Sequence, residues 1–251
     1  MIAFTRRAFI LESLEKNGVI SIKDAAKKLE VAEITIRRDF EKLETEGKLK
    51  RVQGGAAMTD SLDGAELTMT SKLPQNTEKK EKIAQDAVSL VNTGDSVFID
   101  GGTTMLPLAA HLLRLRVRIV TYNTLVLHQS SHPVAEIILI GGEYKPHYNM
   151  NVGSLAQEML KQFYFDRAFY GCAGIDAQRQ LVYTTEYESL NMKKIAMENA
   201  KGNHLLVDSS KFKKQGFLKL CDTTAFDSII TDELTEEIQP LANVSLIKNV
   251  Q

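Results

Sequence analysis

TIRRDFEKLETEGKLKRVQGGA, residues 35–56, is the stretch that decides how the N-terminal part of this chain folds. Across residues 33–46, apolar side chains recur at intervals of four and three, which places them in one buried stripe of a helix. The stripe consists of Ile36, Phe40 and Leu43. At about 100° per residue, the side chains on the other side of the helix face outward. This outward set consists of Ile34, Thr35, Arg38 and Lys42.

The segments on either side of this helix predict a winged helix-turn-helix fold. Residues 5–17 carry an apolar pattern that predicts a first helix. Ser21 and Asp24 form a variant capping box that starts a second helix. Residues 48–53 alternate polar and apolar as a hairpin arm does, and Gly54-Gly55 closes the arm. Three short helices followed by such an arm are typical of a DNA-reading module.

The position of each side chain on this module predicts its role on DNA. A helix in the major groove presents its N-terminal half to the base edges. Arg38 is therefore the predicted bidentate contact to guanine, and Thr35 or Ile34 reads a neighbouring base. Other polar side chains point sideways or lie in the arm, where they contact phosphates without reading sequence. These predicted phosphate contacts are Arg37, Lys42, Lys48, Lys50, Arg51 and Gln53.

Basic charge is concentrated in the same part of the chain. Residues 1–55 hold twelve Lys or Arg against nine Asp or Glu, an excess of +3, whereas the whole chain stands at −1. Such an excess is typical of a surface that meets nucleic acid. An exposed pair such as Arg37-Arg38 is, taken alone, more often an ordinary solvated surface. The prediction therefore depends on the complete pattern of helices and arm.

Length and composition indicate a second, larger domain. The chain has 251 residues, 43% of them hydrophobic, which is far more than the N-terminal module uses. We expect a DNA-binding domain over residues 1–57, a linker over 58–76 and an α/β domain over 77–251. The absence of a long apolar run or signal peptide, together with two isolated cysteines, predicts a cytoplasmic protein with no membrane contact. His128 and His132 lack a nearby acidic or thiol partner, so no metal site is expected.

Short apolar strands alternate with helical segments after residue 95, which predicts a Rossmann-like parallel sheet. The expected strands are residues 96–100, 118–122, 136–141, 166–171, 204–208 and 228–232. In such sheets, ligands bind at the carboxyl ends of the strands. Residues 100–104, DGGTT, follow the first strand and open a helix. Glycine amides, hydroxyls and a helix start together suit a phosphate group.

Other strand ends meet this segment at the same edge of the predicted sheet. Together they offer a carboxylate, an amide and an ammonium around a phosphate loop, which is typical of a sugar-phosphate pocket. Taken singly, each position can equally be an ordinary turn or a helix cap. The expected ligand-binding residues at these strand ends are Asp100, Gly101, Gly102, Thr103, Thr104, Thr121, Asn123, Gly141, Gly142, Asp208 and Lys211.

Both parts of the chain resemble the DeoR-type bacterial transcriptional regulators. TIRRD at 35–39 and RVQGGA at 51–56 match the N-terminal signature of that family. Phe40, Ala32 and Gln53 depart from it, and Ala32 removes a hydroxyl that could cap the third helix. The motifs of the sensor domain are found at residues 100–104, 121–123, 141–142, 166–176, 185–188 and 208–212.

The resemblance implies a sensor domain similar to ribose-5-phosphate isomerase, which binds a phosphorylated sugar or its catabolite. It implies a regulator of carbohydrate use, generally a repressor, whose partners are operator DNA and this effector. It adds Lys72 and Glu186 to the expected effector-binding residues. Because two winged helices must be held at a fixed spacing to read paired half-sites, we expect a homodimer or a higher homo-oligomer.

An isomerase-like enzyme is the main alternative to a regulator. Proton transfer between sugar carbons needs a positioned carboxylate base. The isomerases carry such acids in a DGADE motif, whereas the corresponding strand here has Tyr170 and then Ala173-Gly174 at those positions. We therefore expect a binding domain without catalytic residues or a cofactor. A DNA-coating protein without an effector is a third reading, which leaves most of the chain without a role.

Overall fold

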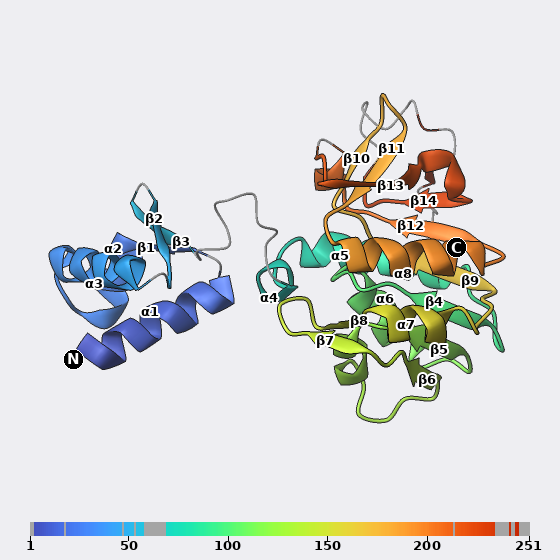
Figure 1. The fold of residues 1–251 in the computed structure, drawn as a ribbon, viewed down its shortest axis with the longest axis horizontal. Coiled ribbons are helices and arrows are strands. Elements are labelled where there is room, and N and C mark those ends of the chain that lie inside the picture. Colours follow the sequence, from blue (N-terminus) through green and yellow to red (C-terminus); the bar gives the residue numbers. More distant parts are fainter. Residues whose placement is uncertain are drawn as a thin grey trace. The chain divides into compact units, whose positions relative to one another are not determined.

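The chain forms two compact units in the computed structural model, Met1–Gln75 and Asn76–Gln251 (Figure 1). The first unit combines helices with a small antiparallel sheet, and the second is a parallel sheet covered by helices. This confirms the predicted fold class, a winged helix-turn-helix followed by a Rossmann-like α/β domain. The structure describes residues 3–17, 19–46, 48–52, 54–57, 69–212, 214–233, 241 and 244–245.

Three helices and a three-stranded sheet in the order β1-β3-β2 form most of the first unit. The helices are α1 (Ala3–Asn17), α2 (Ile22–Leu29) and α3 (Glu33–Thr45). The strands are β1 (Val19–Ser21), β2 (Lys50–Val52) and β3 (Gly55–Ala57). The three predicted helices and the hairpin arm are confirmed. Strand β1 is an addition, because a three-residue strand is too short to show an alternating pattern.

Local chemistry explains where these helices start and how they pack. The Ser21 hydroxyl accepts a hydrogen bond from the Asp24 amide at 3.0 Å and caps α2, as predicted. Ala32 occupies the N-cap position of α3, where its methyl group cannot accept such a bond. The predicted stripe of α3 is fully buried and packs against Ile10 and Leu14 of α1.

A one-turn helix, α4 (Met69–Lys72), forms inside the predicted linker and packs against α1. Burial of the Met69 side chain explains this helix, since only 3% of the residue remains exposed. The sequence signal for it is weak, because one apolar residue does not make a periodic pattern. Residues 58–68 of the predicted linker lie outside the described residues.

The second unit is organised by a seven-stranded sheet in the order β15-β14-β12-β9-β4-β5-β6, in which every pair is parallel. All six predicted strands are present in it. Strand β15 is an addition of two residues. The strands are β4 (Ser96–Ile99), β5 (Arg118–Thr121), β6 (Glu136–Leu139), β9 (Arg167–Tyr170), β12 (Asn203–Leu206), β14 (Ser228–Ile230) and β15 (Val244–Ser245).

Helices cover the sheet on both faces, which explains why its central strands are almost entirely apolar. On one face α5 packs against α6, over a core that includes Val97 and Ile99 of β4. Phe98 points to the opposite face, where its ring contacts those of Phe165 and Tyr170. The helices are α5 (Thr77–Val88), α6 (Met105–Leu112), α7 (Ser154–Leu160) and α8 (Tyr187–Glu198).

Smaller elements lie around the sheet (Figure 1). A hairpin is made of β7 (Glu143–Lys145) and β8 (Met150–Val152). A separate antiparallel sheet contains β10 (Gly174–Asp176), β11 (Leu181–Thr184) and β13 (Leu218–Asp222). Short 3-10 helices are η2 (Thr124–His128), η3 (Ser209–Lys211) and η4 (Thr223–Ala225).

The order of the strands locates the place where a ligand is expected. From β4 the chain continues outward through β5 and β6, then returns to place β9 on the other side of β4. The connections after β4 and β9 therefore leave the sheet in opposite directions. Such a switch point opens a crevice at the carboxyl ends of the two strands.

Candidate functional site

The outward face of α3 carries the predicted base-reading residues. Ile34 is 58% exposed, Arg38 is exposed and Thr35 is half-buried, all in the first half of the helix. Lys42 is exposed one turn further on. This face lies opposite a stripe that is fully buried, so its orientation is set by the core of the unit. The helix therefore offers a guanidinium and a hydroxyl to a partner in solution.

The predicted phosphate contacts differ in how their charges are held. The Arg37 guanidinium lies 3.9 Å from Glu33, and the Lys48 ammonium lies 2.8 Å from Glu46. Lys50 belongs to β2, and Gln53 lies outside the described residues. For all of these, the contact with phosphate stays a prediction.

Among the described residues, Arg51 makes more side-chain bonds than Arg37 or Lys48. Its guanidinium donates to Glu44 at 2.7 Å and to Glu41 at 2.9 Å, and its amide donates to Glu44 at 2.8 Å. The carbonyl of Gly54 accepts from the Ile22 amide at 2.9 Å. These bonds fasten the arm to α3 and α2. Arg51 therefore has a positioning role in addition to any contact with DNA.

Asp39 is the charged member of the TIRRD signature that points inward, beside the buried Ile36. It is 6% exposed and accepts a hydrogen bond from Arg6 of α1, with Arg7 at 3.6 Å. The carboxylate thereby ties α3 to the first helix. The sequence pattern of the helix did not reveal this role, because the two partners are 33 positions apart.

Asp100, at the switch point after β4, is the centre of a buried polar cluster. It is 0% exposed, and its carboxylate accepts from the Gly171 amide at 2.9 Å. It also accepts from Lys193 of α8 and from the Tyr122 hydroxyl. Lys193 donates to the Gly171 carbonyl at 2.9 Å as well and is 4% exposed. An acid and an ammonium from distant segments thus form a buried ion pair.

Tyr122 and Ser189 extend this cluster towards the surface. The Tyr122 hydroxyl lies 3.1 Å from the Ser189 hydroxyl, which belongs to the first turn of α8. Burial, and then the charge of Asp100, raise the pKa of Tyr122, so its hydroxyl keeps its proton and can donate. Lys193 and Ser189 were not predicted. Their signal in the sequence is a Lys and a Ser four residues apart on the buried face of a helix.

Several predicted ligand residues are used by the fold itself. Thr121 is buried and donates to the Ile99 carbonyl at 2.7 Å. Asn123 is also buried; its amide donates to the Gly101 carbonyl at 3.1 Å, and its oxygen accepts from the Leu125 amide at 3.0 Å. Both side chains shape the loops around the switch point. A direct contact between either of them and a ligand stays a prediction.

Two of the predicted glycines lie where a side chain would not fit. A Cβ added to Gly101 would collide with Met150 and Tyr122. Gly142 has φ of 141°, and an added Cβ would lie 2.6 Å from the Val152 carbonyl oxygen, so only glycine fits there. The remaining members of these segments lie at the surface or close to it. Gly102, Thr103 and Thr104 are half-buried, and Gly141 is exposed.

The loop after β12 contributes Asp208 and Lys211 to the same edge. Asp208 is 2% exposed, caps η3 through the Ser210 amide at 3.1 Å, and accepts from Asn76 at 3.0 Å. Lys211 is half-buried. Burial raises the pKa of Cys172 to about 12, and the ammonium groups of Lys211 and Lys193 act on this thiol in the opposite direction. Lys72 belongs to α4 of the first unit and is half-buried.

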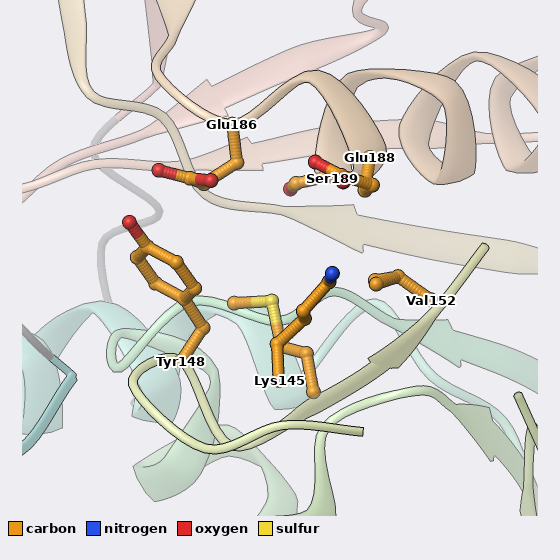
Figure 2. A pocket seen from close by; sticks show the side chains of 7 residues that line it. Lys145, Tyr148, Val152, Glu186, Glu188 and Ser189 are labelled. Atoms are coloured by element: carbon orange, nitrogen blue, oxygen red, sulfur yellow. The ribbon is translucent and has the colours of Figure 1, made fainter. Parts of the chain in front are cut away.

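A pocket of about 200 Å³ lies beside this cluster (Figure 2). Glu186, Glu188 and Ser189 approach it from the start of α8, and Lys145 and Tyr148 face them from the β7–β8 hairpin. Met150 and Val152 complete the apolar part of its wall. The Lys145 ammonium pairs with Glu143 at 2.7 Å. Because Ser189 belongs to both, the pocket adjoins the Asp100 cluster.

The pocket contains one predicted residue, Glu186, and adds several that were not predicted. Lys145 and Tyr148 lie in a hairpin whose strands have three residues each, and sequence periodicity does not place such a hairpin in space. Among the described residues, no group of His, Cys, Asp or Glu is arranged to hold a metal ion. Within the same residues, no helix has the length and apolar character needed to cross a membrane.

Two family models match the chain, one for each part. A model described as the DeoR C terminal sensor domain matches residues 75–233, and one described as a DeoR-like helix-turn-helix domain matches residues 6–62. A lactose phosphotransferase system repressor from Lactococcus lactis subsp. lactis is 34% identical over 229 residues, 89% of this chain and 88% of the relative. The repressor of that name from Streptococcus mutans is 29% identical over 245 residues, 96% of each chain. Among solved structures, ribose 5-phosphate isomerase A from Methanocaldococcus jannaschii matches with a TM-score of 0.41 and 20% identity, over 55% of each chain.

Proposed function

The chain belongs to the DeoR family, and from this premise we propose that it is a repressor of a carbohydrate-utilisation operon whose affinity for operator DNA is set by a phosphorylated sugar. The relatives carry the name of a lactose phosphotransferase system repressor. The observation that carries the proposal for this chain is the exposed N-terminal half of α3. It offers Arg38 and Thr35 opposite a fully buried stripe.

Sequence reading on DNA follows from this exposed face. In the proposed complex, α3 lies in the major groove, Arg38 makes a bidentate contact to guanine, and Thr35 or Ile34 contacts the next base. Arg37, Lys42 and Lys48 reach phosphates and supply the salt-dependent part of the affinity. The arm formed by β2 and β3 follows the neighbouring backbone, at a position that Arg51 maintains through Glu41 and Glu44.

The effector site is proposed at the switch point of the sheet, in the pocket beside the Asp100 cluster. Half-buried carboxylates such as those of Glu186 and Glu188 accept hydrogen bonds from sugar hydroxyls, and Tyr148 covers an apolar face of the ring. The phosphate is expected on the side of Gly101–Thr104 and Lys211, where backbone amides and an ammonium suit an anion. A phosphotransferase system makes sugar phosphates, which is consistent with this ligand class.

Ligand and DNA influence each other through linkage. If the effector favours one arrangement of the protein and DNA another, each weakens the binding of the other by the same free energy, commonly about 1–3 kcal/mol. A homodimer or higher oligomer in the cytoplasm is part of the proposal, since operators present paired half-sites.

The chain is a regulator and not an isomerase. The position of the first acid in the isomerase motif is taken by Tyr170, whose hydroxyl donates to Asn203 at 2.9 Å inside the core. Burial raises the pKa of Tyr170 well above its ordinary value, so it cannot act as a base near neutral pH. The nearest carboxylate at the switch point, Asp100, is paired with Lys193.

Two measurements test the proposal. Selection of duplexes from a random-sequence library identifies the preferred DNA, and titration against a scrambled duplex at several salt concentrations gives its specificity. A thermal-shift panel of hexose and pentose phosphates then identifies ligands, which are retested in the DNA titration. The proposal would be contradicted if the protein bound all duplexes equally and also converted a sugar phosphate into a product.

A further inference from the structure

The first residue of the second unit, Asn76, has an uncommon backbone conformation and is bonded to the loop after β12. Its φ and ψ are 54° and 35°, in the left-handed region, where Asn is among the few residues that fit well. Asn76 occupies the N-cap position of α5, yet its side-chain amide donates to Asp208 at 3.0 Å and to Ser210 at 3.4 Å. The start of α5 is therefore bonded to the loop that follows β12.

Lys79, one turn further along α5, is bonded to the same edge. Its ammonium donates to the Ser209 hydroxyl at 2.6 Å and lies 3.0 Å from the Asp232 carboxylate, which follows β14. Asp232 in turn accepts from the Ser209 amide at 2.6 Å. Lys82 donates to the Asp232 carbonyl at 2.6 Å. The first two turns of α5 thus contact the ends of two neighbouring strands.

The loop that receives these bonds belongs to the proposed effector edge. It carries Lys211 and follows β12, which pairs in parallel with β9, and β9 pairs in parallel with β4. The loop after β12 therefore lies at the same edge of the sheet as the switch point. If the phosphate of a bound ligand attracts the Lys211 ammonium, the loop moves. Its bonds to Asn76 and Lys79 then change.

The chain between α4 and Asn76 is short. Helix α4 packs against α1 within the first unit, and it ends at Lys72. Only Leu73, Pro74 and Gln75 separate it from Asn76. The Gln75 amide donates to the Lys72 carbonyl at 3.2 Å, and proline fixes one backbone angle. In a coupling between the effector site and DNA, a change in the backbone of Asn76 reaches α4 through these three residues.

We infer that Asn76 and Lys79 are the positioning residues that transmit effector binding to the DNA-reading unit. They sense the loop at 208–211 and set the backbone at the joint between α4 and α5. The inference rests on the proposed function and specifies the path from the effector site to the DNA-reading unit. The element with two arrangements is the start of α5, bonded to the loop or released from it, which is the physical requirement for coupling between two sites.

The experiment compares coupling in the full-length chain with that in two variants. Asn76→Gly keeps access to the left-handed backbone but removes the amide bonds, and Lys79→Gln removes the ammonium. Lys161→Gln is the matched control, since Lys161 is exposed and pairs only with Glu158 at 2.6 Å among the described residues. The coupling factor is the ratio of DNA Kd with and without the sugar phosphate that gives the largest thermal shift, drawn from a panel that includes galactose 6-phosphate and fructose 6-phosphate.

Both variants should lower the coupling factor by about 2- to 30-fold, while the control retains it. Thermal melting and effector titration of the free protein check that the variants fold and still bind the sugar phosphate. Wild-type coupling that survives in both folded variants would overturn the inference and leave the proposed function intact. A wild-type chain that binds no sugar phosphate would overturn the proposed function, and this inference with it.

Discussion

The outward face of α3 and the cluster around Asp100 hold their charges in opposite ways. On α3, Arg38 and Lys42 stand in solvent on a helix whose other side is the core. Around Asp100, the ammonium of Lys193 and the carboxylate are both almost completely buried and are bonded to each other. Exposed charges stay hydrated, so they cost the fold little free energy, and they are available to a partner. Buried charges are stable only as a complete set.

The difference separates charges that are available to a partner from charges that serve the fold. A protein cation that neutralises a DNA phosphate releases a counterion from the DNA, and exposed cations such as those on α3 are available for this. The Asp100 cluster instead joins β4, β9 and α8, so its first effect is to fix the geometry of the switch point. A ligand at that edge meets a surface shaped in advance, which favours selective binding.

The largest expected effect comes from breaking the buried pair. Lys193→Met leaves the Asp100 carboxylate buried without its cation, and should lower the free energy of unfolding of the second unit by about 3–5 kcal/mol. Urea unfolding followed by circular dichroism measures it. The double variant with Asp100→Asn should recover part of the loss. If the Lys193→Met protein were as stable as the Lys161→Met control, the buried charges around Asp100 would matter no more for stability than an exposed charge.

Acid should act on the second unit before the first. The His204 ring lies tilted against that of Phe169, with 5.3 Å between the ring centroids, and burial lowers the pKa of His204 to about 4 from an ordinary value near 6.5. Between pH 6.5 and pH 4 the unfolded chain binds a proton that the folded chain does not, so stability falls as the pH falls, by about 2–3 kcal/mol.

The control for this acid response is a variant without the titrating group. All five histidines lie between residues 111 and 204, so the first unit has no such group. His204→Phe should flatten the decline in stability over this pH range. Melting curves recorded at several pH values would count against the assignment if wild type and variant declined in parallel.

Removal of the Arg38 side chain should weaken DNA binding and leave the stability of the fold unchanged. Arg38→Ala is expected to cost about 1–3 kcal/mol of binding to the selected duplex and to relax preference at one base pair. Its melting temperature should match that of wild type, because the side chain is exposed. Equal losses on the selected and scrambled duplexes would show that Arg38 contacts phosphate and not a base.

The smallest effects distinguish two kinds of exposed cation within the first unit. Lys42→Ala should lower the slope of log K against log salt by about one on every duplex. Arg51→Ala should leave the slope nearly unchanged while weakening binding, since Glu41 and Glu44 already balance its charge. Titrations at four or more salt concentrations separate the two; a reduced slope for Arg51→Ala would identify it as a phosphate contact.

Much of the fold was predictable because it rests on local patterns. The spacing of Ile36, Phe40 and Leu43 specified which face of α3 is buried, and thereby which face carries Arg38. The six apolar segments became the six longest strands of the parallel sheet, of which the central strands β4 and β9 are the most buried together with β12. Short elements escaped prediction: β1, α4 and the β7–β8 hairpin are stabilised by contacts with distant parts of their unit.

The sequence by itself determined the division into two domains, the outward face of α3, and the strand ends at the switch point, because helix and strand periods are set by neighbouring residues. Only the tertiary structure decided that Lys193 pairs with Asp100, that Arg51 is held by Glu41 and Glu44, and that Asn76 is bonded to Asp208. These partners are between 7 and 132 positions apart. The tertiary fold brings these partners together, and the local sequence pattern around each residue does not predict which distant residue it contacts.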